Sequence, residues 1–342
     1  MKKLTSILVV LIISISFLSA AVISSPAATV RLTKTKVITT DELETKYNAY
    51  KAAGLGDSIT KTDVLNSMVE DELLLQGAER AGYTLTTTQL DSLYKEYKTL
   101  LEQQNGFAIS DEDYDKEVIA EYGSVDAFKK ELGNNQIASQ YVQTEKASML
   151  KNIPEPTDRD IKNAYRQNQT TMFSQPTMYH IYMIGGTKTD NDAENSAKKA
   201  KFDSIYKDIT SGKVTFEKAV QLYTEDESTK NIGGDYGWMS DNAVVRNSLG
   251  NEFVDYVVEM DVGEVSPVLE TPKAYFIAKV GLIQDAKILQ LTDTISPDSN
   301  VTVRDYIYNV LYQQNAQLMF QQAYQSLIAD LRKQASINII YK

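Results

Sequence analysis

The sequence predicts an α+β protein in which a helical domain is interrupted by a second domain built on a small sheet. Apolar residues recur at helical spacing through 40–150 and again through 301–334. Between these segments, the runs 178–184 and 275–280 have the pattern of strands, and glycine-containing turns separate them. A chain of 342 residues is long enough for two domains that each bury a core.

Composition excludes several classes of function. The formal net charge of -11 disfavours nucleic acid as a partner, because its phosphates require a basic face. The chain has no cysteine, which excludes disulfides, thiolate zinc sites and cysteine nucleophiles. Only one histidine is present, His180, so most metal-dependent and triad chemistries are excluded as well. We therefore expect no cofactor, no metal and no nucleic acid.

The N-terminus has the features of an export signal. The basic start Met1–Lys3 precedes an apolar run from Leu4 to Ile23, and small residues follow that run. We predict residues 1–28 to be a signal peptide. The run is also long enough to span a bilayer, so an uncleaved anchor is the alternative, and only then is membrane contact expected. In both cases the remainder is predicted to be periplasmic or otherwise extracytoplasmic.

Helix boundaries in the first half follow from capping residues and glycines. After a β-prone stretch at 30–38, Thr40 is expected to cap a helix that begins at Asp41. A second helix is expected from about Thr62, with Gly82 just past its end. Pro154 and Pro156 then mark a linker. Further helices are expected at 86–104, after Ser110, from Ser124 to Leu150, and from Thr157 to Tyr165.

The segment 301–334 needs a partner, because an isolated amphipathic helix leaves its apolar stripe in water. We expect it to return to the N-terminal helices, with a strand near 337–341 pairing with 30–33. The helical domain is then discontinuous. The predicted division is a helical domain at 29–172, a sheet domain at 173–284, and a C-terminal helix and strand at 285–342 that return to the helical domain.

The middle section contains several motifs in a fixed order. His180 lies on the first strand, Thr224-Glu225-Asp226 follows two helical stretches, and Gly233-Gly234-Asp235-Tyr236-Gly237-Trp238 forms a glycine-rich turn. Gly263-Glu264-Val265-Ser266-Pro267-Val268 and a last strand at Tyr275–Val280 complete the order. It resembles the parvulin (PpiC-type) peptidyl-prolyl isomerases. The resemblance implies an antiparallel sheet surrounded by helices and activity on prolyl peptide bonds.

A second resemblance concerns the N-terminal half. Val37–Leu43 and Leu65–Gln76, followed by Ala78–Gly82, are similar to the start of SurA- and PrsA-type foldases. The segment 320–340 is similar to their C-terminal helix and strand. This resemblance implies a chaperone domain whose partners are unfolded or nascent exported polypeptides.

The parvulin resemblance implies site residues position by position. His180 matches the first-strand histidine, Asp226 the residue facing the substrate carbonyl, and Thr271 a family threonine, and these three are the predicted catalytic residues. Phe276 stands where the family has a second histidine. The predicted substrate-binding residues are Tyr236, Leu249, Phe253 and Phe276.

Two functions remain open from the sequence. The first is an exported peptidyl-prolyl isomerase and chaperone that assists folding of secreted or outer-membrane proteins, with activity weakened by Phe276. The alternative is a non-catalytic holdase whose parvulin-like domain only binds peptides. Phe253, Tyr256 and Met260 also fit an ordinary helix core face, so the prolyl pocket competes with a purely structural interpretation. A generic exported surface protein is a third, less favoured, possibility.

Overall fold

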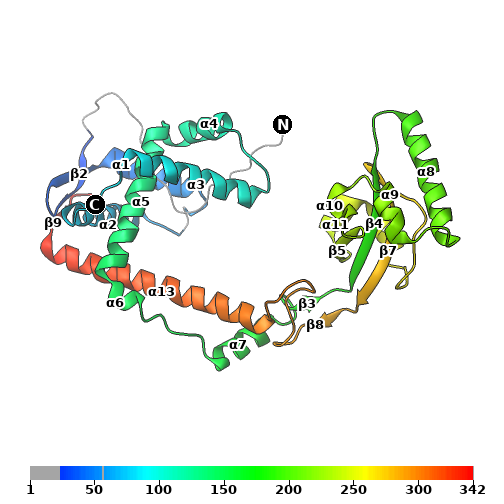
Figure 1. Cartoon of the computed structure of the whole chain (residues 1–342). Helices are drawn as coiled ribbons and strands as arrows, with labels where there is room; N and C mark the ends of the chain where they lie inside the picture. The colour runs from blue at the N-terminus through cyan, green and yellow to red at the C-terminus, as the bar shows by residue number, and fades with distance from the viewer. Residues whose placement is uncertain (1–23, 56–57, 342) are drawn as a thin grey trace. The chain divides into compact units, whose positions relative to one another are not determined.

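The computed structural model describes residues 24–55 and 58–341 (Figure 1). Helices and antiparallel strands are both present, which confirms the α+β prediction. The chain divides into two compact units. Unit 1 comprises Met1–Glu155 and Gln313–Lys342, and unit 2 comprises Pro156–Tyr312. Residues 156–172 and 285–312 therefore group with the sheet domain, whereas the sequence analysis assigned them to the helical one.

Unit 1 contains a three-stranded antiparallel sheet. Its strands are β1 (Pro26–Arg31), β2 (Thr35–Thr39) and β9 (Ser336–Ile339), in the order β2-β1-β9. Val30 pairs with Ile337, which confirms the expected pairing of the two chain ends. Ala27 and Ala28 are completely buried in β1, so cleavage after residue 28 would remove half of this strand. The rest of the predicted signal, residues 1–23, lies outside the described residues.

The helices of unit 1 begin at local caps. Ser110 and Ser124 accept backbone N–H bonds from residues three positions on, as expected. Thr39, not Thr40, caps the first helix, and it shares a capping box with Glu42. The helices are α1 (Thr40–Ala52), α2 (Lys61–Arg80), α3 (Thr87–Asn105), α4 (Asp111–Tyr122), α5 (Val125–Glu145), α6 (Ala147–Leu150) and the part of α13 (Val303–Gln334) from Gln313 onward.

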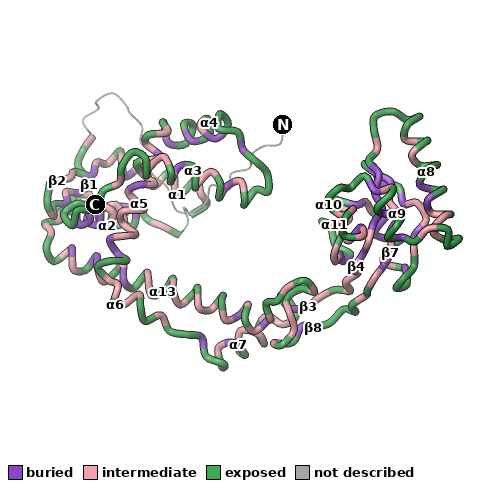
Figure 2. The backbone as a smooth tube through the Cα atoms, viewed as in Figure 1, coloured by how far each residue is buried: buried purple, intermediate pink, exposed green. Residues whose placement is uncertain are grey.

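The main core of unit 1 joins β1, α2, α5 and the C-terminal part of α13. Ala323, Leu327 and Leu331 of α13 are buried in this cluster. Figure 2 colours the backbone by the burial of each residue. Gln76 of α2 is completely buried, and its side-chain oxygen accepts bonds from three consecutive backbone N–H groups, at 2.9, 2.9 and 3.2 Å. These belong to Leu32, Thr33 and Lys34, in the turn between β1 and β2. The α2 helix is thereby attached to the hairpin.

A small cluster explains why residues flanking the sheet domain belong to unit 2. Helix α7 (Asp158–Asn168) carries Ile161, and the short strands β3 (Ser174–Gln175) and β8 (Lys287–Ile288) pair with each other. The cluster consists of Ile161, Phe173, Leu289, Val303 and Ile307. Because these apolar side chains cover one another, the two flanking segments are held together beside the sheet domain's chain entry and exit.

The larger sheet of unit 2 has four antiparallel strands in the order β5-β4-β7-β6. They are β4 (Met178–Thr187), β5 (Asp235–Met239), β6 (Leu269–Glu270) and β7 (Ala274–Gln284), which confirms the strands expected at 178–184 and 275–280. The helices are α8 (Asp192–Thr210), α9 (Phe216–Tyr223), α10 (Glu227–Lys230), α11 (Ala243–Leu249) and α12 (Asn251–Val257).

Each face of this sheet packs against a different set of helices. Ile181 and Met183 of β4 belong to a cluster with α11 and α12, and Ile184 belongs to a cluster with α8 and α9. We call these the α12 face and the α8 face. Among the described helices of both units, none is long and apolar enough to cross a membrane.

Candidate functional site

An aromatic pair forms the centre of the predicted prolyl pocket on the α12 face. The rings of Phe253 and Phe276 pack edge to face with centroids 5.6 Å apart, and Leu249 lies in the same cluster. Gly185 pairs with Phe276 across the strands, and a Cβ there would lie only 3.1 Å from the Phe276 ring. The absence of a side chain at Gly185 on β4 therefore leaves room for the Phe276 ring, which projects from β7.

The exposure of these residues differs. Phe253 is 0% exposed and Leu249 is buried, whereas Phe276 is half-buried. Tyr236 on β5 is 43% exposed. In this conformation the side chains of Phe276 and Tyr236 are accessible to solvent, while Phe253 is completely buried.

His180 lies on the other side of the sheet. Its neighbour Ile181 belongs to the cluster of the α12 face, and successive residues of a strand point to opposite faces. The His180 ring packs instead against Trp238 and Tyr182, at centroid distances of 5.0 and 5.1 Å. Tyr182 packs against the cluster of the α8 face. The structure thus does not bring His180 together with Phe276.

The contacts of His180 lead to the glycine-rich turn. Its Nε2 lies 3.3 Å from a carboxylate oxygen of Asp235, and the same oxygen accepts a 2.8 Å bond from the N–H of Gly237. Its Nδ1 is buried without a hydrogen-bond partner in the described part of the chain. Asp235 and Trp238 were not predicted to be neighbours of His180, although antiparallel pairing of the turn's strand with the His180 strand would have indicated them.

Asp226 caps the short helix α10. Its carboxylate accepts bonds from the Ser228 N–H, the Ser228 hydroxyl and the Thr229 hydroxyl, at 3.0, 2.6 and 2.8 Å. Hydrogen bonds from Ser228 and then Thr229 hold the pKa of the Asp226 carboxyl below its ordinary value, against the opposing effect of burial. Near neutral pH the Asp226 carboxylate is therefore ionised and already accepts hydrogen bonds from Ser228 and Thr229. An ionised carboxylate has no proton to donate.

The loop that carries Asp226 is attached to the strand beneath Phe276. The hydroxyl of buried Thr224 accepts a 3.2 Å bond from the N–H of Gly185, and the N–H of Glu225 donates a 2.8 Å bond to the Gly185 carbonyl. Since Phe276 packs on Gly185, this loop and the aromatic pair are neighbours.

Thr271 has a local structural role. Its hydroxyl bonds both the N–H and the carbonyl of Ala274, at 3.0 and 3.1 Å, and so closes the turn between β6 and β7. Its methyl carbon would lie 3.9 Å from a Cβ at Gly250, between α11 and α12. The structure therefore places Thr271 beside the α12 face, with its hydroxyl already bonded.

The arrangement offers apolar contact and shape rather than acid–base chemistry. Within 24–55 and 58–341, no group of three or more potential ligand side chains is placed to hold a metal ion. On the α12 face, half-buried Phe276 packs against the buried layer that contains Leu249 and Phe253. Tyr236 is exposed on β5, which is separated from the Phe276 strand β7 by β4.

Comparisons with known proteins agree with this architecture. Residues 164–282 match the family described as the PPIC-type PPIASE domain. The chain is 24% identical over 225 residues to the chaperone SurA of Nitrosococcus oceani, an alignment that covers 65% of this chain and 48% of that protein. It is 25% identical over 219 residues to the foldase protein PrsA of Caldanaerobacter subterraneus, covering 64% and 56%. The chain spans about half the length of these curated relatives.

Among solved structures, similarity extends over most of the chain. A structure from a study of two structurally related SurA-like chaperones in Campylobacter jejuni is 16% identical, covers 93% of this chain and 100% of that chain, and has a TM-score of 0.39. The PrsA structure from Bacillus subtilis is 20% identical, covers 86% and 88%, and has a TM-score of 0.27.

Proposed function

Because the chain belongs to the parvulin-type peptidyl-prolyl isomerases of the SurA and PrsA family, we propose that it binds prolyl segments of unfolded polypeptides and isomerises them. The observation that carries the proposal is the aromatic pair Phe253 and Phe276 beside the Asp226 loop, within the segment that matches the PPIC-type domain. The apolar N-terminal run supports an extracytoplasmic location and exported proteins as clients.

The chemistry requires no nucleophile. The barrier to rotation about a peptide bond is about 18–20 kcal/mol and comes from amide resonance. A site accelerates rotation when it binds the twisted bond better than the planar one, and an apolar surface that removes water from the carbonyl favours the twisted state. In this proposal Tyr236 and Phe276 contact the prolyl segment, and Leu249 and Phe253 support them.

The remaining predicted residues act indirectly in this scheme. His180 contacts Asp235 and thereby positions the glycine-rich turn from which Tyr236 projects. Asp226 holds the start of α10, and Thr271 closes the turn that leads into β7, the strand of Phe276. Isomerase activity is then expected to be weak, because Phe276 replaces the second family histidine and His180 lies on the opposite face of the sheet.

A specific observation favours a second candidate function, a holdase without turnover. Phe276 replaces the second family histidine and packs on Phe253, which is completely buried. A parvulin-like unit of this kind would serve as a peptide-binding module, with chaperone activity independent of catalysis.

Phe276→His separates the two candidates. The smaller, polar imidazole uncovers part of Phe253 and adds a hydrogen-bonding group, and one organising hydrogen bond corresponds to about tenfold in rate. We expect a rate increase of that size in a protease-free prolyl-isomerisation assay on the full chain. Phe276→Leu, which keeps an apolar side chain, is the matched control and should not exceed the parent.

The outcomes assign the function. A parent that suppresses aggregation of an unfolded outer-membrane protein while parent, His and Leu variants all lack isomerase activity establishes the holdase. A parent that binds no prolyl peptide at all refutes the proposed site. Phe253→Ala is unsuitable for this purpose, because removing a completely buried ring costs about 3–5 kcal/mol and unfolds the surrounding core.

A further inference from the structure

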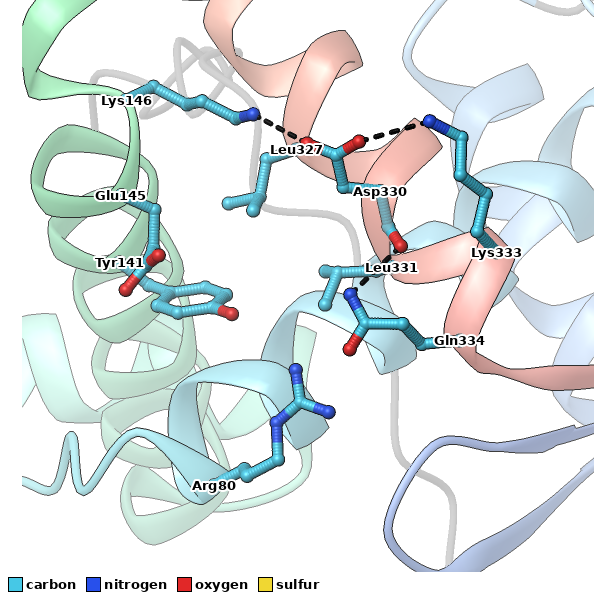
Figure 3. A pocket seen from close by; sticks show the side chains of 9 residues that line it. All are labelled: Arg80, Tyr141, Glu145, Lys146, Leu327, Asp330, Leu331, Lys333 and Gln334. Carbon is cyan, nitrogen blue, oxygen red and sulfur yellow. Dashed lines mark hydrogen bonds and ion pairs between the residues drawn. The ribbon is translucent and has the colours of Figure 1, made fainter.

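A cavity of about 420 Å³ lies in unit 1, remote in sequence from the parvulin-like segment (Figure 3). It forms where three helices of this unit end. Arg80 is the last residue of α2, Glu145 the last of α5 and Gln334 the last of α13, and all three line the cavity.

Two of the cations at this cavity are already paired with a carboxylate. Asp330 accepts a 2.7 Å bond from Lys146 and a 3.2 Å bond from Lys333. Figure 3 draws both contacts. The Lys146 bond attaches the end of α5 to the last turns of α13, whereas Lys333 and Asp330 both belong to α13. Arg80 is the remaining cation of the cavity lining.

Arg80 is directed into the cavity. Figure 3 shows its guanidinium group pointing toward the Tyr141 hydroxyl and the Gln334 amide. Among the ion pairs of the described residues, none includes Arg80, but its guanidinium group hydrogen-bonds the Tyr141 hydroxyl. That bond lowers the pKa of Tyr141 against the larger, raising effect of burial. A basic residue in the last helical turn is favourable to the helix dipole, but the dipole alone does not explain the cavity in front of it.

The cavity wall beside Arg80 is apolar and closely packed. Leu327, Leu331 and the Tyr141 ring line it, and all three side chains are buried. A Cβ at Gly77 would lie 2.8 Å from the Tyr141 ring and 3.2 Å from Leu331, so this glycine allows α2 to approach both. Burial raises the pKa of Tyr141, which keeps its hydroxyl protonated as a hydrogen-bond donor.

We propose that this cavity binds a carboxylate of an unfolded polypeptide together with the apolar side chain next to it. The inference rests on the proposed function in that it assumes polypeptide clients. The guanidinium of Arg80 matches a carboxylate with paired donors, the Tyr141 hydroxyl adds a third donor, and Leu327 and Leu331 accept the apolar side chain. The carboxylate can belong to a chain end or to an acidic side chain.

Three fluorescent peptides test the inference by anisotropy on the full chain. One ends in Leu with a free carboxylate, the second is its C-terminal amide, and the third is the amide with Glu before the Leu. We expect the free acid to bind about fivefold tighter than the amide, the effect of one partly exposed ion pair. Binding of the Glu peptide like the acid identifies a side-chain carboxylate as sufficient, and binding like the amide identifies the chain end.

Charge variants at exposed positions supply the controls. Arg80→Gln should abolish the difference between acid and amide, whereas Glu145→Gln removes a like charge from the rim and should strengthen acid binding. Lys51→Gln, in the last turn of α1, is the matched control and should leave the difference unchanged. Equal binding of acid and amide by the parent, or an acid preference that persists in Arg80→Gln, overturns the inference.

Aggregation suppression measured on the same protein separates this inference from the proposed function. A parent that suppresses aggregation but binds acid and amide equally refutes the carboxylate site alone. A parent that distinguishes acid from amide, yet neither suppresses aggregation nor isomerises prolyl bonds, refutes the proposed function and retains the site.

Discussion

The two larger sheets of this protein differ in how far apart in the sequence their strands lie. In unit 1 the sheet order β2-β1-β9 joins the first described strand to the last strand of the chain. In unit 2 the sheet order β5-β4-β7-β6 takes all its strands from Met178–Gln284. The unit 1 core also contains Ala323, Leu327 and Leu331 of α13, whereas the larger sheet of unit 2 pairs only strands within one segment. We therefore expect unit 1 to need the C-terminal segment for its fold and the unit 2 sheet not to need it.

Removing Gln313–Lys342 is the most severe test of this difference. The deletion takes away β9 and the buried side chains of α13, including Leu327 and Leu331. Each buried leucine lost costs about 2–5 kcal/mol, and the sum reaches the whole stability of a typical domain. We expect α2 amides to lose protection from hydrogen exchange while β4 amides keep theirs. Native-like protection of α2 in the truncated protein would contradict the prediction.

Gln76→Met tests the same unit with a smaller change. Methionine fills the space but leaves the N–H groups of Leu32, Thr33 and Lys34 without their acceptor. An unsatisfied buried donor costs about 1–3 kcal/mol, and these groups are partly buried. We expect unit 1 to lose about 2–3 kcal/mol of unfolding free energy in a urea titration, with unit 2 unchanged.

The matched control for that variant is Gln89→Met. Gln89 makes the same kind of side-chain to backbone bond in an exposed capping box at the start of α3, where water replaces the lost acceptor. Its cost should stay at or below about 1 kcal/mol. Equal losses of unfolding free energy in the two variants would show that the burial of Gln76 does not increase the cost of removing its hydrogen bonds.

The smallest effect is expected in unit 2, at the local cap of α10. Because the pKa of the Asp226 carboxyl is lowered by bonds from Ser228 and Thr229, its stabilising effect is present above the unfolded pKa and is lost as the pH falls through the folded pKa. Asp226→Asn should lower unit 2 stability by about 0.5–1 kcal/mol at pH 7. The difference from the parent should begin to shrink as the pH falls below about 4, the unfolded pKa, and should vanish only below the lower folded pKa. A difference that is independent of pH would exclude the charge as its cause.

Much of this fold was predictable from the sequence because the relevant signals are local. Ser110, Ser124 and Thr157 each cap a helix with a bond to a residue three positions on, so the cap and its partner lie in one short segment. The pairing of Val30 with Ile337 also followed, since a long apolar stripe after the sheet domain had to return to the N-terminal helices.

Helix continuity and domain limits were less predictable. The helix expected to reach Leu150 is interrupted at Lys146, where the side chain turns to Asp330 of α13. Residues 156–172 and 285–312 group with unit 2. Phe173 and Leu289, which lie at the two ends of the sheet domain, belong to the same apolar cluster and hold these segments together. Both outcomes depend on partners far along the chain.

By itself the sequence determined the α+β class, the order of the motifs and the residue types at the positions predicted for the site: His180, Asp226, Phe253 and Phe276. Only the tertiary structure decided what those side chains face. An irregularity between His180 and Ile181 in the pairing of β4 with β7 accompanies a histidine on the α8 face, opposite the aromatic pair. The physical reason is that a strand's alternation specifies two faces but not which face meets which helix. That choice is made by contacts between segments distant in sequence.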